Sequence, residues 1–369
     1  MNFLLVCSGT AGHINPALAI AESLRRVMPD ANILFVGSGR ELENRLIPAA
    51  GYEIKNIKMT GLKRGFSPSK IIYNIKTVKN LAMSGGEAGR IIRDFKPNTV
   101  IGTGGYVCYP VLKKAARMGT PTMIHESNAV PGLTTKLLSA CVDKVLVSFP
   151  NIQDLYKRPE RVVFTGTPVR GGFEKKPDRE PDTKPLVVSF WGSLGAARMN
   201  EAMAEFIKLN IDSGHAMFNH IHATGGKKDS VEAMKNRLKN LGAPDDLPSG
   251  IEIREYIDDM PSVMASADIV LCRAGASTIA ELTVMGKPAV LVPSPYVTDN
   301  HQEENAKQLQ KTGGAVMLLE KDCTGQVLYD TVSEGLMNKE KLAKMSAAQR
   351  ALGTLGAAEK IVDLIVTMC

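Results

Sequence analysis

One pattern occurs twice in the chain and restricts its fold more than any other feature. The first copy is the opening "NFLLVCSGTAGHINPALAIAESL", and the second is "PLVVSFWGSLGAARMNEAMAEF" from Pro185. Each copy reads as an apolar strand, a turn of small residues and a helix. Units of this kind open parallel α/β sheets. We therefore expect two Rossmann-like domains, one beginning at each copy.

The remainder of each half continues the alternation of strand and helix. Apolar runs separated by helical patterns are "ANILFVG", "TVIGTGG", "TPTMIHE" and "KVLVSF" in the first half, and "MFNHIHATG", "IEIREYI", "ADIVLCRAG" and "PAVLVPS" in the second. Continuous apolar runs are typical of parallel strands buried on both faces. The predicted fold class is α/β, with two parallel-sheet domains facing a cleft.

The expected division of the chain follows from its length and from one polar segment. A chain of 369 residues with 44% hydrophobic content is too long for one ordinary core. The segment "GGFEKKPDREPDTKP" is rich in Gly, Pro and charge, as linkers are. We expect a first domain at 1–165, a linker at 166–185, a second domain at 186–350, and a final helix at 351–369 packing back on the first domain.

Composition excludes several classes of protein. The opening lacks a basic leader, and no apolar run reaches the roughly 18 residues of a spanning helix, so we expect a chain that stays in the cytoplasm. The six cysteines show no CxxC pairs and read as reduced thiols. Residues 1–165 contain 22 Lys and Arg against 11 Asp and Glu, whereas the remainder contains 23 against 27. The first half is therefore expected to meet an anionic partner: a phosphate-bearing substrate, a membrane surface or nucleic acid.

The stretch "MTGLKRGFSPSKIIYNIKTVKNLA" at 59–82 has the composition of an amphipathic helix at a membrane surface. Its apolar residues Ile71, Ile72 and Ile75 recur at helical spacing, with Lys63 and Arg64 nearby. An ordinary surface helix needs the same stripe, and periodicity alone favours that simpler reading.

The stretch "CRAGASTIAELTVMGKP" at 272–288 indicates a nucleotide site. A helix that begins near Ala276 or Ser277, directly after a strand, directs free N–H groups and its positive dipole end at a ligand, which suits a diphosphate. Glu281 can then accept hydrogen bonds from ribose hydroxyls. An acidic residue that merely complements the helix dipole is the equally open alternative. In the matching turn "FWGSLGA", Ser193 is placed to donate to a phosphate.

Known nucleotide fingerprints are absent from these turns. Neither G-x-G-x-x-G nor G-x-x-x-x-G-K-[ST] occurs, which disfavours a nicotinamide enzyme and a phosphate-loop NTPase.

His13 ends the first Gly-rich turn, with Pro16 expected in the first turn of the next helix. A histidine there can take a proton from a substrate hydroxyl, or it can simply cap the helix or contact phosphate.

Metal sites are not indicated. His220 and His222 share a strand face but lack a third ligand. Asp258 and Asp259 precede Met-Pro, which is typical of a helix N-cap. We therefore expect no obligatory metal or other cofactor, with stimulation by a divalent cation left open.

Taken together, the motifs resemble the bacterial MurG family, within glycosyltransferase family 28. They run in order from "GTAGHINPALAIAE" through "GTGGYVCYP", "IHESNAVPGLTTKLL" and "GTPVR" to "GSLGAARMN", "YIDDMP", "RAGASTIAELTVMGKP" and "DNHQEENA". The resemblance implies a GT-B fold. It also implies an inverting transfer of GlcNAc from UDP-GlcNAc to the muramoyl 4-hydroxyl of undecaprenyl-diphospho-muramoyl-pentapeptide (lipid I), which gives lipid II for peptidoglycan.

The resemblance assigns the donor mainly to the second domain. Ile257 would bind uracil through its backbone, Glu281 the ribose, and Gln302 the sugar. The remaining implied donor contacts are Ser193, Ala276, Ser277 and Thr278 at the diphosphate, Asn128 at the sugar, Arg170 near the nucleotide, and Thr10, Ala11 and Gly12 from the first turn.

The resemblance assigns the acceptor to the first domain. Gly9, Gly12, Gly104 and Gly105 would hold the acceptor's diphosphate, and His13 would be the base for its hydroxyl. The 59–82 stretch would lie on the cytoplasmic face of the bacterial membrane, making the protein peripheral. Trp191 and Leu194 stand where the family usually has Gly and Gln, and Ser8 and Ala11 replace two glycines of the first turn.

Two other enzyme readings stay open, and one binding reading is disfavoured. A GT-B enzyme acting on another lipid, such as a diacylglycerol, would share the donor half. A UDP-GlcNAc 2-epimerase would share the fold and the nucleotide, but the basic first half argues against it. A nucleic-acid-binding module is disfavoured because no basic motif is interleaved with aromatic residues.

Overall fold

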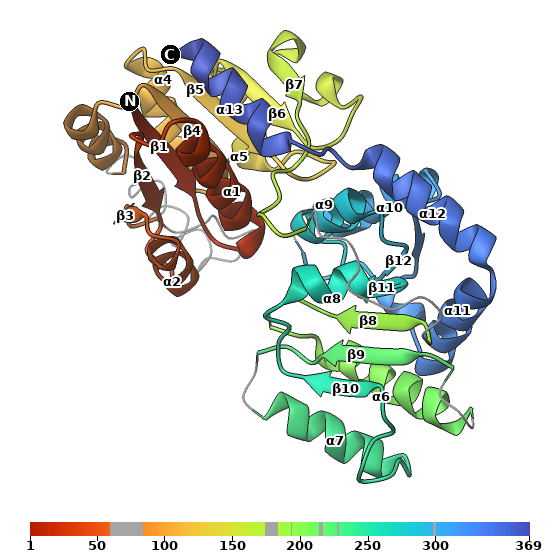
Figure 1. Cartoon of the computed structure of the whole chain (residues 1–369). Coiled ribbons are helices and arrows are strands. Elements are labelled where there is room, and N and C mark those ends of the chain that lie inside the picture. Colours follow the sequence, from red (N-terminus) through yellow and green to blue (C-terminus); the bar gives the residue numbers. More distant parts are fainter. Residues whose placement is uncertain (60–83, 174–183, 193, 214–216, 227–228, 298–299) are drawn as a thin grey trace, which may run out of the picture. The chain divides into compact units, whose positions relative to one another are not determined.

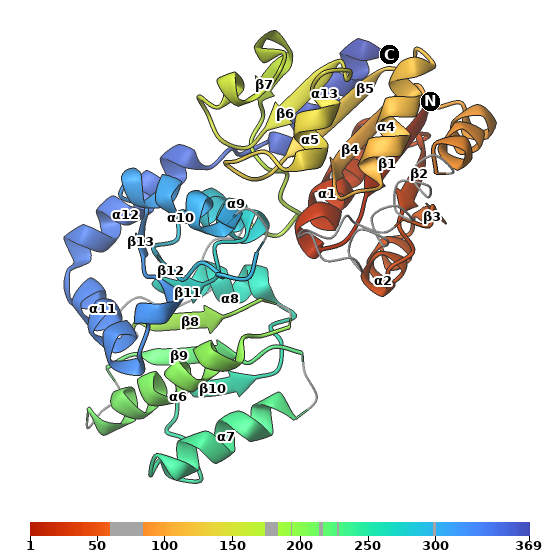
Figure 2. The same cartoon turned by 180° about the vertical axis from the view of Figure 1, so that it is seen from behind.

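The structure is a computed structural model, and it divides into two compact units (Figures 1 and 2). It describes all residues except 60–83, 174–183, 193, 214–216, 227–228 and 298–299. Unit 1 consists of Met1–Arg170 with Thr354–Cys369, and unit 2 of Gly171–Gly353. Each unit holds one parallel sheet with helices, so the predicted α/β class with two Rossmann-like domains is confirmed.

Unit 1 is built on a seven-stranded parallel sheet in the order β3-β2-β1-β4-β5-β6-β7. Its strands are β1 (Asn2–Cys7), β2 (Asn32–Gly37), β3 (Glu53–Asn56), β4 (Thr99–Gly104), β5 (Thr122–Glu126), β6 (Lys144–Val147) and β7 (Val162–Phe164). Its helices are α1 (Ala11–Val27), α2 (Glu41–Ala49), residues 84–95, α4 (Cys108–Arg117), α5 (Leu133–Leu138), the short η1 (Gln153–Leu155) and η2 (Pro159–Arg161), and α13 (Ala357–Met368). The interior strand β1 is apolar and buried from Phe3 to Cys7, and it contributes to the core of unit 1.

The last helix of the chain completes unit 1. Ile361, Val362 and Ile365 of α13 are fully buried and share a core cluster with Ile14 of α1. Figure 1 shows α13 beside α1, far from it in sequence. The spacing of these three apolar residues gives α13 one buried face, as the 3.6-residue helical period requires.

Unit 2 is built on a six-stranded parallel sheet in the order β10-β9-β8-β11-β12-β13. Its strands are β8 (Leu186–Phe190), β9 (Asn219–Ala223), β10 (Ile251–Arg254), β11 (Ile269–Cys272), β12 (Ala289–Leu291) and β13 (Ala315–Met317). Its helices are α6 (Ala197–Asp212), α7 (Ser230–Asn240), α8 (Met260–Ser266), α9 (Ala276–Met285), α10 (His301–Lys311), η4 (Glu320–Asp322), α11 (Gly325–Met337) and α12 (Lys339–Leu352). In both sheets the strand that opens the repeated unit, β1 or β8, lies in the interior, so the turns that follow them meet neighbouring turns at the carboxyl edge.

Candidate functional site

The turn after β1 leads directly into α1 and carries His13. The helix begins at Ala11, earlier than Pro16 suggested, because the carbonyl of Thr10 already accepts the N–H groups of His13 (3.0 Å) and Ile14 (3.2 Å). His13 therefore lies in the first helical turn rather than at the end of the loop.

The hydrogen bonds of His13 define its tautomer. Its Nδ1 lies 2.8 Å from the carbonyl oxygen of Ser8. A carbonyl oxygen only accepts, so in the neutral ring Nδ1 carries the proton and Nε2 keeps its lone pair. The hydroxyl of Thr103 donates to the His13 carbonyl at 2.7 Å, which ties α1 to the end of β4. The ring is thus oriented with an unprotonated nitrogen available to accept a proton.

Two glycines after β4 pack against this turn. A Cβ on Gly104 would lie 2.4 Å from Cδ2 of His13, and one on Gly105 would lie 2.2 Å from Oγ of Ser8. Both residues also have positive φ, which other L-residues rarely adopt. The structure therefore brings together Gly12 and His13 of α1, the Gly9–Thr10 turn before them and the Gly104–Gly105 turn.

A buried carboxylate that we did not single out in the sequence lies beneath the same turn. Glu43 of α2 is fully buried. Its Oε1 accepts the Gly9 N–H (2.8 Å) and the Ser38 hydroxyl (2.7 Å). Its Oε2 accepts the N–H groups of Ser38 (2.6 Å), Gly39 (3.0 Å) and Arg40 (3.4 Å). The pattern "GRELE" reads only as a charged helix start, so the long-range bond to Gly9 had no signal in the sequence.

Asn128 is held by a second buried carboxylate that the sequence did not reveal. Oε1 of Glu126 accepts the backbone N–H (3.1 Å) and the Nδ2 (2.9 Å) of Asn128. Its Oε2 accepts the N–H of Gly132 (3.0 Å) and the hydroxyl of Thr135 (2.7 Å). These bonds fix the loop between β5 and α5 and the orientation of the Asn128 amide. Arg170 ends this part of unit 1 and forms no ion pair with a described residue.

In unit 2, α9 starts directly after β11, as predicted, and carries two polar side chains that have no partner among the described residues. The helix has Gly275 as its N-cap and no acidic residue in its first turn, so its first N–H groups lack a side-chain cap. The hydroxyl of Ser277 is buried without a hydrogen-bond partner among described residues, and Ala276 and Thr278 beside it are partly exposed.

Glu281 lies one turn further along α9 and is only partly exposed. Burial raises the pKa of its carboxyl from 4.5 to about 8. It forms no hydrogen bond or ion pair with another described residue. A desolvated carboxyl without partners is what a site for ligand hydroxyls needs, because bound hydroxyls would stabilise its charged form.

Arg273, in the turn between β11 and α9, contacts residues that follow β8, β12 and β13. Its guanidinium pairs with Glu320 at 2.6 Å, both side chains being buried, and donates to the carbonyl of Val292 at 3.1 Å. It also lies 5.9 Å from the ring centre of Trp191, which is 3% exposed. Trp191 thus fills core space below the turn after β8. Gln302 of α10 accepts the Ser294 N–H at 2.8 Å through Oε1, which directs its Nε2 elsewhere as a donor.

The turn after β8 is closed by glycines. A Cβ on Gly195 would lie 2.2 Å from the carbonyl oxygen of Thr224, and one on Gly225 would lie 2.3 Å from the Gly195 nitrogen. The turns after β8 and β9 therefore touch backbone to backbone. Ser193, in the first of these turns, lies outside the described residues.

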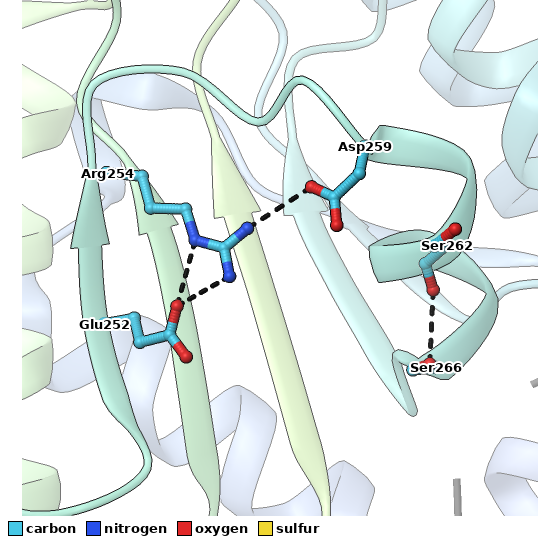
Figure 3. Close-up of polar contacts among 5 residues, drawn as sticks. All are labelled: Glu252, Arg254, Asp259, Ser262 and Ser266. Atoms are coloured by element: carbon cyan, nitrogen blue, oxygen red, sulfur yellow. Dashed lines mark hydrogen bonds and ion pairs between the residues drawn. The ribbon is translucent and has the colours of Figure 1, made fainter. Parts of the chain in front are cut away.

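Ile257 is buried in the short loop between β10 and α8. Figure 3 shows Arg254, at the end of β10, between Glu252 of the same strand (2.6 Å) and Asp259 at the start of α8 (3.3 Å). Asp259 holds the predicted N-cap position, but its side chain makes no cap hydrogen bond and pairs with Arg254 instead. The ion pair thus spans the loop that carries Ile257.

No metal cluster occurs in the parts of the chain that the structure describes. His220 and His222 both contact the hydroxyl of Ser189, at 2.8 and 2.7 Å. Burial lowers the pKa of both rings, that of His222 to about 4, so the pair is neutral. The residues predicted to meet a membrane, Lys63, Arg64, Ile71, Ile72 and Ile75, all lie outside the described residues. Among the described helices, none is long and apolar enough to cross a membrane.

Family comparisons cover both units. The "Glycosyltransferase family 28 N-terminal domain" model matches residues 3–147, and the "Glycosyltransferase family 28 C-terminal domain" model matches residues 186–365. The chain belongs to glycosyltransferase family 28. Together with the relatives and the solved structure described next, these matches confirm the MurG-family resemblance of the motifs.

Relatives of this family 28 chain extend over its whole length. It is 43% identical to the "UDP-N-acetylglucosamine--N-acetylmuramyl-(pentapeptide) pyrophosphoryl-undecaprenol N-acetylglucosamine transferase" of Acetivibrio thermocellus, over 99% of this chain and 97% of the relative. A protein of the same name from Bacillus cytotoxicus is 39% identical over 99% and 98%. The crystal structure of Acinetobacter baumannii MurG covers 100% of both chains at 29% identity, with a TM-score of 0.76. A UDP-GlcNAc 2-epimerase from Neisseria meningitidis has a TM-score of 0.62 at 14% identity, which shows a shared fold alone.

Proposed function

We propose that this family 28 enzyme transfers GlcNAc from UDP-GlcNAc to the 4-hydroxyl of the muramoyl sugar in undecaprenyl-diphospho-muramoyl-pentapeptide. The transfer inverts the anomeric centre, forms a β-1,4 linkage and releases UDP. The observation that carries the proposal is the match at 43% identity, over nearly the whole of both chains, to a transferase named for these substrates.

The donor occupies unit 2. The N-terminus of α9 and the hydroxyl of Ser277 support a diphosphate there, since both supply donors that no described side chain accepts. Glu281, one turn along, accepts the ribose hydroxyls, and the loop of Ile257 receives the base. Ser193, Ala276 and Thr278 contribute to the diphosphate and Gln302 to the sugar. We also assign Asn128, Arg170, Thr10, Ala11 and Gly12 to donor binding, as the family resemblance implies.

The acceptor occupies unit 1. Gly9, Gly12, Gly104 and Gly105 approach its diphosphate, for which the positive end of α1 is suited. His13 is the base, because its Nε2 lone pair can take the proton of the 4-hydroxyl as that oxygen attacks the anomeric carbon. The departing diphosphate charge is stabilised by the α9 dipole, so we propose no obligatory metal or cofactor. A divalent cation could stimulate without being required.

The enzyme works as a peripheral protein on the cytoplasmic face of the membrane that carries the acceptor. Leu133 and Leu137 of α5 are 48% and 44% exposed, one turn apart, with the exposed Lys136 beside them. Exposed leucines next to a basic residue favour contact with an anionic lipid surface. Replacing Leu133 and Leu137 by Ser is expected to weaken binding to anionic vesicles, while UDP binding stays unchanged. Vesicle binding that survives this double change and the change of Ile71 and Ile72 to Ser would contradict the assignment.

Acceptor choice separates the proposed reaction from its rivals. Purified protein is incubated with labelled UDP-GlcNAc and a short-chain muramoyl-pentapeptide lipid, a diacylglycerol, or no acceptor. Label on the muramoyl lipid alone is the expected result. Label on the diacylglycerol would indicate a different lipid acceptor, and conversion of UDP-GlcNAc to its 2-epimer without acceptor would indicate an epimerase.

The role of His13 is tested by its substitution. In His13→Ala, kcat is expected to fall by about a hundredfold or more, because general bases typically contribute that much. Affinity for UDP-GlcNAc, measured by calorimetry, is expected to stay within about twofold of wild type. Equal loss of turnover and affinity would make His13 a binding residue.

A further inference from the structure

One peptide group joins the buried Glu43 to His13. The peptide bond between Ser8 and Gly9 has the Ser8 carbonyl at one end and the Gly9 N–H at the other. The carbonyl accepts the Nδ1–H of His13 at 2.8 Å, and the N–H donates to Oε1 of Glu43 at 2.8 Å. A carboxylate, a peptide and an imidazole thus form one continuous hydrogen-bonded chain.

This chain is built into unit 1 rather than lying at its surface. Glu43 is fully buried, and its other four acceptor contacts go to the Ser38–Arg40 turn after β2. A Cβ on Gly37 would lie 2.6 Å from its Oε2, so only glycine leaves room there. At the other end, the Ser8 N–H donates to the Gly104 carbonyl at 3.1 Å. The linking peptide is therefore held on both sides.

Hydrogen bonds in such chains strengthen one another. A carboxylate that accepts the Gly9 N–H polarises the peptide and makes the Ser8 carbonyl a better acceptor for Nδ1–H. In enzymes with a Ser-His-Asp triad, a carboxylate contacts the catalytic histidine directly and fixes its tautomer. Replacing that carboxylate by an amide leaves the histidine in the wrong tautomer. Here the contact passes through the backbone.

We propose that Glu43 is a positioning residue for His13, acting through the Ser8–Gly9 peptide to hold the imidazole with Nδ1 protonated and Nε2 facing the acceptor hydroxyl. The proposal rests on the proposed function only in taking His13 as the base. Glu43 itself touches no substrate.

The tautomer tests the proposal without any need for catalysis. In protein labelled with ¹⁵N-histidine, long-range ¹H–¹⁵N correlations distinguish Nδ1–H from Nε2–H, and His13→Gln assigns the signal. Wild-type His13 is expected as the Nδ1–H form alone. Glu43→Gln is expected to give a mixture of the two His13 tautomers. The NH2 group of the glutamine would face backbone N–H donors, which need an acceptor, so the link to the Gly9 N–H is weakened. Wild-type His13 found as Nε2–H would overturn the proposal even if no variant folds.

Kinetics give the second test. Glu43→Gln is expected to lower kcat about tenfold, as loss of a group that orients a functional histidine does, with affinity for UDP-GlcNAc within about twofold. The control is Glu41→Gln, an exposed carboxylate in the first turn of the same helix, which should behave as wild type. In a His13→Ala background, Glu43→Gln should cause no further loss. Losses that multiply, or a lowered kcat with an unchanged tautomer, would reduce Glu43 to a structural residue.

A failure to fold is covered by a milder variant. If the melting curve shows that Glu43→Gln is unfolded, Glu43→Asp keeps the negative charge for the Ser38–Arg40 amides but is one methylene too short for the Gly9 N–H. The same mixture of tautomers and loss of kcat are then expected, and their absence would contradict the proposal. If the wild-type enzyme transfers no GlcNAc to the muramoyl lipid, the proposed function fails. The tautomer experiment still tests whether Glu43 positions His13 through the Ser8–Gly9 peptide.

Discussion

At the scale of single residues, Glu281 is desolvated and forms no hydrogen bond or ion pair with another described residue. Its pKa is about 8 in the folded protein and near 4.5 when unfolded. A raised pKa stabilises the fold below the unfolded pKa, and this stability is lost as pH rises toward the folded pKa. We expect the free energy of unfolding of wild type to decline from pH 4.5 to 8 relative to Glu281→Gln, by at most about 1.4 kcal/mol per pH unit. Urea unfolding of both proteins across this range measures it, and parallel curves would contradict the expected pKa.

The same residue predicts proton release when the nucleotide binds. Ribose hydroxyls that donate to Glu281 favour its charged form, so UDP binding at pH 7.5 should expel a proton. Calorimetry in buffers of different ionisation enthalpy counts the protons released on UDP binding. The same measurement on Glu281→Gln gives the protons released by the UDP phosphates, which are subtracted. We expect the variant to release fewer protons and to bind UDP about tenfold more weakly, as loss of a charge-assisted hydrogen bond predicts. Equal proton counts in the two proteins would mean that Glu281 lies outside the nucleotide site.

At the scale of elements, the turn after β8 depends on contact between glycines. Gly195→Ala places a Cβ 2.2 Å from the Thr224 carbonyl oxygen at a φ of +67°, so this turn must move. We expect the KM for UDP-GlcNAc to rise about tenfold and stability to fall by roughly 1–3 kcal/mol. Gly313→Ala is the matched control, since its φ is +78° and no described atom lies within 4 Å of its added Cβ. A KM change shared by both variants would indicate general strain rather than turn geometry.

Interior strands could be predicted from the sequence, whereas most edge strands could not. Interior strands such as β2 and β11 were predicted because both faces are buried and their runs are continuously apolar. Three of the four edge strands, β3, β7 and β13, were not predicted, because their runs are short and their side chains partly exposed; the fourth, β10, was predicted from "IEIREYI".

Some residues of the candidate site could be predicted from the sequence, and others could not. The α9 turn was predicted because helix start and strand end are adjacent in sequence. Glu43 and Glu126 were not singled out, because Glu43 acts on Gly9 across 34 residues and both read locally as charged residues beside turns. Trp191 read as a departure from a glycine turn, whereas the structure makes it part of the unit 2 core.

At the scale of the whole molecule, unit 1 needs the end of the chain. Ile361→Ala is expected to destabilise unit 1 by about 2–5 kcal/mol, since a fully buried isoleucine leaves a cavity. UDP binding to unit 2 should persist. Glu359→Gln breaks only the exposed pair with Arg26 and should cost less than about 1 kcal/mol. Differential scanning calorimetry with and without UDP separates the two units. A loss of UDP binding in Ile361→Ala at a temperature where unit 2 is folded would contradict this division.

Transfer of GlcNAc to the muramoyl 4-hydroxyl leaves a product whose structure identifies the reaction. The wild-type chain is incubated with UDP-GlcNAc and a short-chain muramoyl-pentapeptide lipid, and the lipid is analysed by mass spectrometry and proton NMR. We expect one added N-acetylhexosamine, with a β anomeric proton and a link to position 4 of the muramoyl sugar. An unmodified lipid beside consumed UDP-GlcNAc, an α anomer, or a link to another position would contradict this reaction.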